Sequence, residues 1–382
     1  MPINKSWEQH IAVFGESGSG KTIMLSSFFG SAQEPEFIQQ NLFRIVADDG
    51  GQGNKLHQNY LGMRDESRVP ITDRFTSTTY NFSLKLKANS QPKKHKSPFS
   101  SVKLVWHDYP GEWFESGVKN ELEAERRIET FRNLLQSDVA LILIDSQRLI
   151  SSPGEENLYL KSLLGNLRNT LLSLQDDIIP DGKKLEKFPR IWVFALSKCD
   201  LLPEYDVYRF RDLLIAKVAG EITELREVIS SFVTGQEALS VGDDFVLLSS
   251  AQFKSDRIET RKRIGVDLML PVASVLPLQR HLHWAETLTL PGKLSKFLIS
   301  GVGAGVSLLI KYNNRLPAPF AKALLKVTPG MVDEIANLAG EALDKLQKSA
   351  LQNKDYLAAT IAGFQKDLEN AEQANTLLRR EP

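Results

Sequence analysis

The chain has 382 residues, 47 basic and 47 acidic, so its formal net charge is zero and gives no electrostatic reason to expect nucleic acid as the main partner. The length suits about two domains, or one enlarged domain with an appendage, and a hydrophobic content of 42% is enough for a sizeable core. The single cysteine excludes a disulfide framework within the chain. The first residues have no apolar signal core, so we expect a reducing, cytoplasmic compartment.

Short apolar runs alternate with helical stretches, a pattern that predicts an α/β sandwich around a mostly parallel sheet. The first run, 10–15, leads into a glycine-rich loop and an apolar helix. The alternating stretch 80–87 predicts a more exposed strand, joined by a polar loop to the strand that follows. We expect these two strands to form an antiparallel hairpin at the edge of the sheet. The remaining buried strands are predicted at 101–108, 139–145, 191–197 and 245–250.

The glycine-rich loop, residues 15–22, reads GESGSGKT and matches the phosphate-binding pattern G-x-x-x-x-G-K-[ST] between a strand and a helix. Glycines allow backbone N–H groups to turn inward around phosphates, and the helix N-terminus adds partial positive charge. Lys21 would reach the β- and γ-phosphates, and the Thr22 hydroxyl would coordinate Mg²⁺. The other positions predicted to contact the nucleotide are Gly15, Glu16, Ser17, Gly18, Ser19 and Gly20.

A long polar segment, 31–79, connects the first helix to the next strand. Connections of this length are usually functional or mobile, and this one lies where a nucleotide-sensing switch would lie. A switch threonine that touches Mg²⁺ in the triphosphate state should precede the strand. Thr72 is favoured for this role and Thr76 comes next, ahead of Thr78 and Thr79.

The stretch 106–114, WHDYPGEWF, follows the predicted hairpin. Asp108 ends a strand, where a carboxylate can hold Mg²⁺ through water, and Gly111 would let a backbone N–H approach the γ-phosphate. Glu112 then falls where a water-positioning group is needed. By itself DYPGE could equally be an ordinary turn, but the phosphate loop on a neighbouring strand favours the functional interpretation.

A later strand ends in LSKCD, so Ser197, Lys198 and Asp200 match the pattern [NTS]-K-x-D. An aspartate there can accept hydrogen bonds from guanine N1–H and the 2-amino group, a donor pair that adenine lacks. The next strand ends in SSAQ, where Ser250 and Ala251 would form the turn that offers a backbone N–H to guanine O6. Four motifs therefore follow in order, each at the carboxyl end of a strand, where ligand sites of α/β proteins lie.

This order of motifs resembles the TRAFAC class of P-loop GTPases over about residues 8–285. The loop is close to that of myosins and septins, but myosins lack the SKCD-type motif and septins lack a DYPGE stretch. HDYPGEW is more similar to the bacterial YcjX-like and double-GTPase-like families. The resemblance implies a Ras-like α/β domain with enlarged loops, one antiparallel edge strand and helices on both faces. It also implies hydrolysis of GTP to GDP with Mg²⁺.

Two positions depart from the pattern of these families. Ser197 replaces the usual asparagine, which weakens one support of the base site. Ser17 stands where many small GTPases have glycine, and its side chain could crowd a catalytic arginine that reaches in from outside.

The composition changes near residue 290, so we predict a GTPase domain at 1–290 and a C-terminal helical domain at 291–382. No strand pattern occurs after Thr328, and apolar residues recur every three to four positions, as on amphipathic helices. A hairpin and one long helix fit residues 331–379 equally well. The apolar run 297–310 is shorter than the roughly 20 residues of a spanning helix, which favours a packed helix contact over membrane contact.

These features predict a nucleotide-controlled switch that relays its state through the C-terminal helices to a protein partner. A self-assembling scaffold or mechanochemical GTPase is the alternative, and a GTP-binding module with little turnover is a third. Glu112 would place a carboxylate near the γ-phosphate, and no arginine follows in the DYPGEWFESG stretch. We therefore expect slow hydrolysis by the isolated protein.

Overall fold

The structure is a computed structural model. It describes residues 6–70, 78–87, 101–108, 111, 121–151, 153–287, 344, 347–348, 351 and 356–380.

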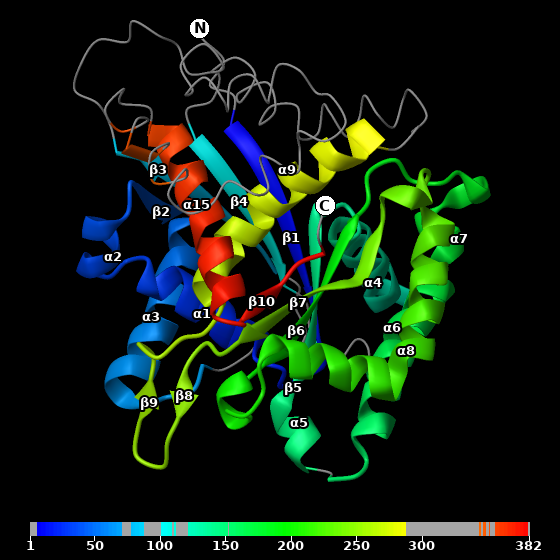
Figure 1. The fold of residues 1–382 in the computed structure, drawn as a ribbon, viewed down its shortest axis with the longest axis horizontal. Coiled ribbons are helices and arrows are strands. Elements are labelled where there is room, and N and C mark those ends of the chain that lie inside the picture. Colours follow the sequence, from blue (N-terminus) through cyan, green and yellow to red (C-terminus); the bar gives the residue numbers. More distant parts are fainter. Residues whose placement is uncertain are drawn as a thin grey trace, which may run out of the picture.

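A central sheet organises the described residues, and it contains eight strands in the order β10-β7-β6-β5-β1-β4-β3-β2 (Figure 1). Neighbouring strands from β7 to β4 pair in parallel, whereas β2, β3 and β10 join by antiparallel pairing. The predicted mostly parallel α/β sheet is therefore confirmed. The strands are β1 (Ser6–Phe14), β2 (Phe43–Ala47), β3 (Thr78–Leu86), β4 (Ser101–Asp108), β5 (Val139–Asp145), β6 (Ile191–Ser197), β7 (Ser240–Leu248) and β10 (Leu377–Leu378), and β8 (Gln252–Phe253) and β9 (Ile258–Glu259) form a separate pair.

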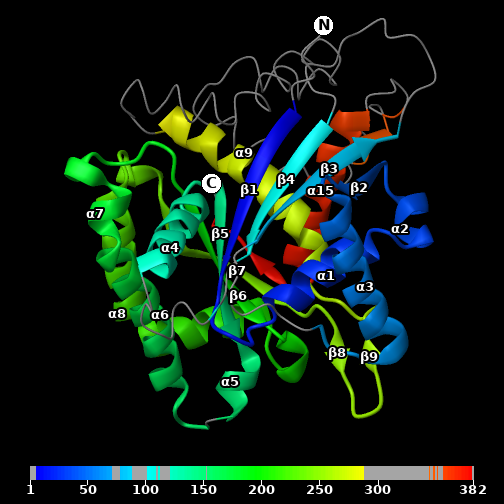
Figure 2. The same ribbon diagram turned by 180° about the vertical axis from the view of Figure 1, so that it is seen from behind.

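Helices cover both faces of the sheet, and alternate residues of β1 show the division. Ile11 and Val13 belong to one core with α1, α3, α9 and α15, whereas Ala12 and Phe14 belong to the other with α4, α6 and α8. Figure 1 shows α9 and α15 across one face, and Figure 2 shows α4 on the other. The helices are α1 (Lys21–Ser31), α2 (Pro35–Gln40), α3 (Gly50–Glu66), α4 (Glu121–Leu134), α5 (Ser146–Ser151), α6 (Glu156–Ser173), α7 (Gln175–Ile178), α8 (Val207–Phe232), α9 (Met269–Thr287) and α15 (Tyr356–Gln373).

The segment 31–79 is folded over most of its length, as α2, β2 and α3. The antiparallel pairing of β3 with β4 is confirmed, but the prediction that it lies at the sheet edge is wrong, because β2 pairs with the outer side of β3. The run DDGG, which resembles a loop, caps a helix: the Asp49 carboxylate accepts a hydrogen bond from Gln52 N at 2.9 Å. Whether this segment senses a nucleotide stays a prediction.

The end of the chain returns to the sheet. In the antiparallel pair β10–β7, Leu377 lies opposite Val246, and α15 packs against α9. The expectation of no strand after Thr328 is therefore wrong. The sequence did not indicate this strand because two residues are too few to show a periodic pattern. The predicted domain boundary near residue 290 lies among residues that the structure does not describe, and it stays a prediction.

The question of a hairpin or one long helix is decided by two contacts. Lys366 Nζ lies 2.5 Å from Asp344 Oδ1, and Gln347 Nε2 lies 3.5 Å from Ala359 O. A continuous helix rises about 1.5 Å per residue and would hold these pairs far apart, so the chain reverses direction between them. In the described part of the chain, no helix has the length and apolar character to cross a membrane, and the run 297–310 lies outside that part.

A buried ion pair ties three parts of the sequence together. The Asp244 side chain in β7 is 0% exposed, and one of its carboxylate oxygens lies 2.7 Å from Arg280 Nη2 of α9. The same oxygen accepts from the backbone N–H of Arg380 at 3.1 Å, and the other accepts from the Ser240 hydroxyl at 2.7 Å. β7, α9 and the end of the chain therefore meet at one carboxylate.

We expect Asp244→Ala to lower the free energy of unfolding by about 3–5 kcal/mol, because the buried Arg280 guanidinium would lose its counter-charge. The neighbouring Asp243 pairs with Arg226 and Arg380 nearer the surface, so Asp243→Ala should cost less than about 1 kcal/mol. Urea unfolding followed by circular dichroism measures both values. If both variants lose the same free energy of unfolding, the buried ion pair stabilises the fold no more than the pairs nearer the surface.

Candidate nucleotide site

The glycine-rich loop between β1 and α1 curves around the side chain of Lys21. Gly18 and Gly20 have φ angles of 80° and 93°, a conformation that glycine adopts most readily. The buried Lys21 ammonium donates to the backbone oxygens of Gly15 at 2.6 Å and Glu16 at 3.0 Å. The loop thus holds a cation within its curve, where it could contact a phosphate group.

The end of β4 lies beside this loop. In the parallel pair β1–β4, Ala12 lies opposite His107, so Asp108 reaches the strand end that leads into the loop. Gly111 lies against the loop itself: a Cβ atom on it would stand 2.3 Å from Ser17 N and 2.5 Å from Glu16 C. Only glycine fits there without moving the loop.

The predicted metal ligands are consistent with a magnesium site that also uses phosphate oxygens. Thr22 lies in the first turn of α1, and Asp108 is partly buried at the end of β4. Mg²⁺ is often held by one or two protein groups together with phosphates and water. Among the described residues, no group of three His, Cys, Asp or Glu side chains could hold a metal ion. Glu112 and Thr72 lie outside the described residues, and their catalytic roles stay predictions.

The predicted base motif follows β6 directly. Ser197 is the last residue of that strand, Lys198 has a left-handed φ of 54°, and Asp200 lies in a short 3₁₀ helix at Cys199–Leu201. The Ser249 hydroxyl donates to Asp200 Oδ1 at 2.7 Å. The motif is thus joined to the turn that follows β7, and the Asp200 carboxylate is oriented by that turn.

The turn after β7 also contacts the helix of the phosphate loop. Ser27 of α1 donates its hydroxyl hydrogen to Ser250 O at 2.8 Å, and Ala251 is buried. A hollow opens between the two halves of the site. Its lining includes Ser19 and Gly20 from the phosphate loop and Ser197, Lys198, Ser250 and Ala251 from the base side. The structure therefore brings six of the predicted nucleotide residues to one hollow, whereas Lys21, Thr22 and Asp200 are not part of its lining.

Residues that belong to none of the four motifs complete the site. Asp145 ends β5, between the strands of the phosphate loop and the base motif, and is 4% exposed. Its Oδ2 atom lies 2.8 Å from Lys198 Nζ, and its Oδ1 atom accepts from Gln147 N at 2.9 Å. Arg148 of α5 forms an ion pair with Glu16 of the phosphate loop at 3.3 Å.

Sequence reasoning missed Asp145, Arg148 and Ser249. A signal for Asp145 was present, because an acidic residue closes the otherwise apolar run VALILID at the carboxyl edge of a parallel sheet. Ser249 begins the SSAQ stretch, but nothing in that stretch indicated its hydrogen bond to Asp200, and no signal pointed to Arg148, whose contact with Glu16 joins distant segments.

Comparisons with known proteins were made for both the sequence and the fold. The model of the family described as Double-GTPase 2 matches residues 9–238. No curated protein sequence matches the chain. Three solved structures have a distant similarity to the chain.

One similar structure is the G domain of the T. maritima FeoB iron transporter, 13% identical, with 59% of this chain and 98% of that chain covered and a TM-score of 0.23. Another is Methanosarcina barkeri Roco2 RocCORdC bound to GDP, 11% identical, with 99% and 95% covered and a TM-score of 0.24. A third is the LeoA bacterial dynamin GTPase from ETEC, 12% identical, with 96% and 50% covered and a TM-score of 0.26.

The family match spans more than half of the chain and contains the phosphate loop, the DYPG stretch and the SKCD motif. It confirms the resemblance to double-GTPase-like proteins and the P-loop GTPase fold. The chain belongs to the Double-GTPase 2 family.

Proposed function

We propose that the chain binds GTP and hydrolyses it to GDP with Mg²⁺. The observation that carries this proposal is the meeting of two halves at one edge of the sheet: a phosphate loop that surrounds Lys21, and an aspartate held by the turn after β7. Membership of a GTPase family supports guanine nucleotides as ligands. The identity of the metal and the rate of turnover are part of the proposal.

Each residue of the phosphate half has a separate task. Lys21 would offset negative charge on the β- and γ-phosphates, and Thr22 and Asp108 would hold the metal ion. Bound Mg²⁺ would neutralise charge that develops on the phosphate oxygens during transfer. Gly111, which touches the loop at Ser17, allows its backbone N–H to approach the γ-phosphate.

The base half selects guanine through hydrogen bonds. The Asp200 carboxylate accepts from N1–H and the 2-amino group, and Ser249 keeps it in position. Ala251 and Ser250 offer the backbone of the turn, and the stem of Lys198 lies along the base. A buried carboxylate, Asp145, holds the Lys198 ammonium in place.

We also propose that the nucleotide state is relayed to the C-terminal helices and through them to a protein partner. β10 pairs with β7, and Leu247 N donates to Thr376 O at 2.9 Å, one residue before the end of β7. On the other side, Phe364 of α15 meets Phe43 of β2 edge-on, with 5.5 Å between ring centroids. α15 thus contacts the 31–79 segment, and the strand that follows it pairs with β7, which leads into the base turn.

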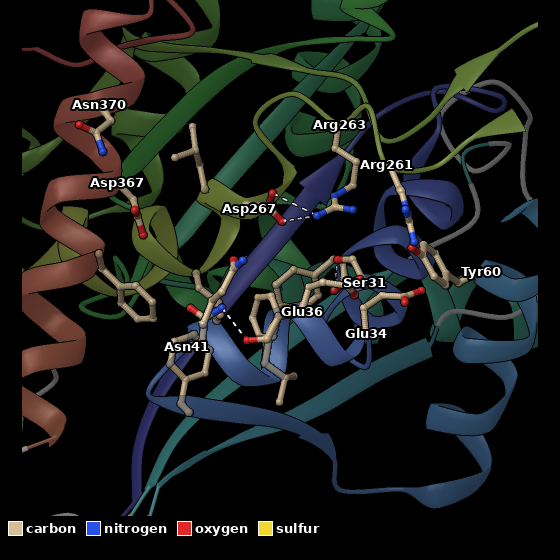
Figure 3. Close-up of a pocket in the computed structure, with 18 residues that line it drawn as sticks. Ser31, Glu34, Glu36, Asn41, Tyr60, Arg261, Arg263, Asp267, Asp367 and Asn370 are labelled. Carbon is tan, nitrogen blue, oxygen red and sulfur yellow. Dashed lines mark hydrogen bonds and ion pairs between the residues drawn. The ribbon is translucent and has the colours of Figure 1, made fainter.

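A cavity of about 560 Å³ is lined by residues of α15 and of the 31–79 segment, together with residues of α1 and of the stretch 261–270. Figure 3 shows Asp367 and Asn370 of α15 on one side of it, and Glu34, Tyr60 and Arg261 on the other. Its volume is within the usual range of ligand pockets. A rearrangement of α15 relative to the 31–79 segment, which the proposed relay requires, would change the shape of this cavity.

Lys21→Ala should weaken GTP binding at least about 30-fold, because truncating one member of a buried charge contact costs ~2 kcal/mol or more. Titration calorimetry on the folded variant measures the dissociation constant. An unchanged affinity would show that the loop is not the nucleotide site.

Asp200→Asn should move the preference from guanine toward xanthine nucleotides, because the amide can donate to the additional base oxygen. Competition binding with GTP, XTP and ATP measures the order of affinities. Ser249→Ala is the matched control: it releases Asp200 but keeps the carboxylate, so GTP should bind more weakly while remaining preferred over XTP. A wild-type protein that prefers ATP would contradict the guanine assignment.

Hydrolysis by the isolated protein should be slow, and a partner or self-association should accelerate it. The Glu112 carboxylate would face the γ-phosphate, and like charges repel more strongly in a partly dry site. Single-turnover GTP hydrolysis over a range of protein concentrations tests this, with Glu112→Gln and Glu112→Ala alongside. A hydrolysis rate that rises with protein concentration favours the self-assembly alternative. A fast rate that is the same at all concentrations and in both variants would show that neither Glu112 nor a partner is needed for hydrolysis.

A further inference from the structure

A chain of contacts joins Glu16 of the phosphate loop to Lys198 of the base motif through three residues that lie outside both motifs. Glu16 Oε2 lies 3.3 Å from Arg148 Nη1, and the Arg148 guanidinium lies 6.0 Å from the centroid of the Tyr159 ring. The Tyr159 hydroxyl oxygen accepts from the backbone N–H of Asp145 at 2.9 Å. Asp145 Oδ2 then reaches Lys198 Nζ at 2.8 Å.

The two ends of this chain lie in parts of the site that bind different parts of a nucleotide. Glu16 is the second residue of the phosphate loop, and Lys198 is the lysine of the base motif. The three residues between them lie on β5, α5 and α6, which contain none of the four motifs. These elements therefore connect the two halves through side chains and the backbone N–H of Asp145.

The charge of Glu16 explains why a cation is needed at this place. Its side chain is 7% exposed and lies in a loop that would receive phosphate groups. A buried carboxylate requires a counter-charge, and more so when an anion binds next to it. Arg148 supplies positive charge from outside the loop, and the Tyr159 ring restricts where its guanidinium can lie.

A simple surface ion pair is the competing interpretation, because 44% of the Arg148 side chain is exposed. An ion pair of that kind would affect the phosphate loop alone. The contacts of Tyr159 with both Arg148 and Asp145 extend the connection to the base side, and Asp145 is itself buried. The two interpretations differ in what a change at Arg148 does to guanine recognition.

We propose that Arg148 is a positioning residue that couples phosphate binding to guanine recognition through Tyr159 and Asp145. The inference rests on the proposed guanine nucleotide site and adds a regulating contact to it. When Arg148 holds Glu16 and Tyr159 together, Asp145 keeps Lys198 in place, and the turn that follows Lys198 presents Asp200 to the base. Loss of Arg148 should therefore weaken discrimination between bases, although Arg148 itself belongs to the phosphate side.

The experiment compares GDP with IDP, whose base lacks the 2-amino group that would donate a hydrogen bond to Asp200. Calorimetry on the full chain gives both dissociation constants. The discrimination ratio, which is the dissociation constant of IDP divided by that of GDP, measures how strongly the site prefers the base with the 2-amino group. Arg148→Ala should reduce this ratio about fivefold, the lower end of usual coupling factors between sites. Tyr159→Phe keeps the ring under Arg148 but removes the oxygen that accepts from Asp145, so it should lower the ratio as well.

Arg211→Ala is the matched control. Arg211 also stacks on a tyrosine, Tyr208 at 5.4 Å, and pairs with a carboxylate, Asp212 at 2.6 Å, but all three lie on α8. The ratio of the IDP and GDP dissociation constants of Arg211→Ala should equal that of the wild type. Melting curves establish that each variant is folded, and Tyr159→Phe carries the test if Arg148→Ala does not fold.

The outcomes separate this inference from the proposed function. If Arg148→Ala raises both dissociation constants by the same factor, Arg148 serves the phosphate loop alone and the coupling is refuted, while the guanine site stands. A ratio as unchanged as that of Arg211→Ala refutes it equally. If the wild type binds GDP no better than ADP, the proposed function fails and this inference fails with it.

Discussion

The parallel pairing of β4, β1, β5, β6 and β7 is the constraint on which the rest of the structure depends. Each of these strands ends at the same edge of the sheet, so segments far apart in sequence become neighbours there. β5 and β6 are buried along their whole length, because helices cover both faces. Their apolar residues pack between the helices and fix the positions of the strands. The polar residues at the ends of the strands therefore lie at fixed places on the sheet edge, where they could contact a ligand.

That edge carries both signs of charge, and most of the charged groups are matched. Lys198 is held by Asp145, and Arg148 is held by Glu16. A site for an anionic ligand that also contains buried carboxylates must offset them, or it would repel the ligand. The pairs meet this requirement and at the same time fix the positions of the side chains that would touch a nucleotide.

The end of the chain completes the sheet on the side of the base motif. β10 pairs with β7, and the buried Asp244 carboxylate joins β7 to α9 and to the backbone of Arg380. Because β7 also leads into the turn that holds Asp200, the C-terminal segment and the base site share one strand. The relay that we propose would act through this shared strand.

The sequence by itself determined the α/β class, the phosphate loop and the bounds of β4, β5 and β6, because these depend on local periodicity and spacing, whereas β1 and β7 begin four or five residues before their predicted runs. β5 and β6 begin and end where their apolar runs do. The tertiary structure alone decided that β2 lies at one sheet edge and that β10 pairs with β7, since such short strands carry almost no pattern. It also decided the contacts of Arg148 and Ser249, because a hydrogen bond or ion pair between residues more than 40 positions apart leaves no trace in either segment's own sequence.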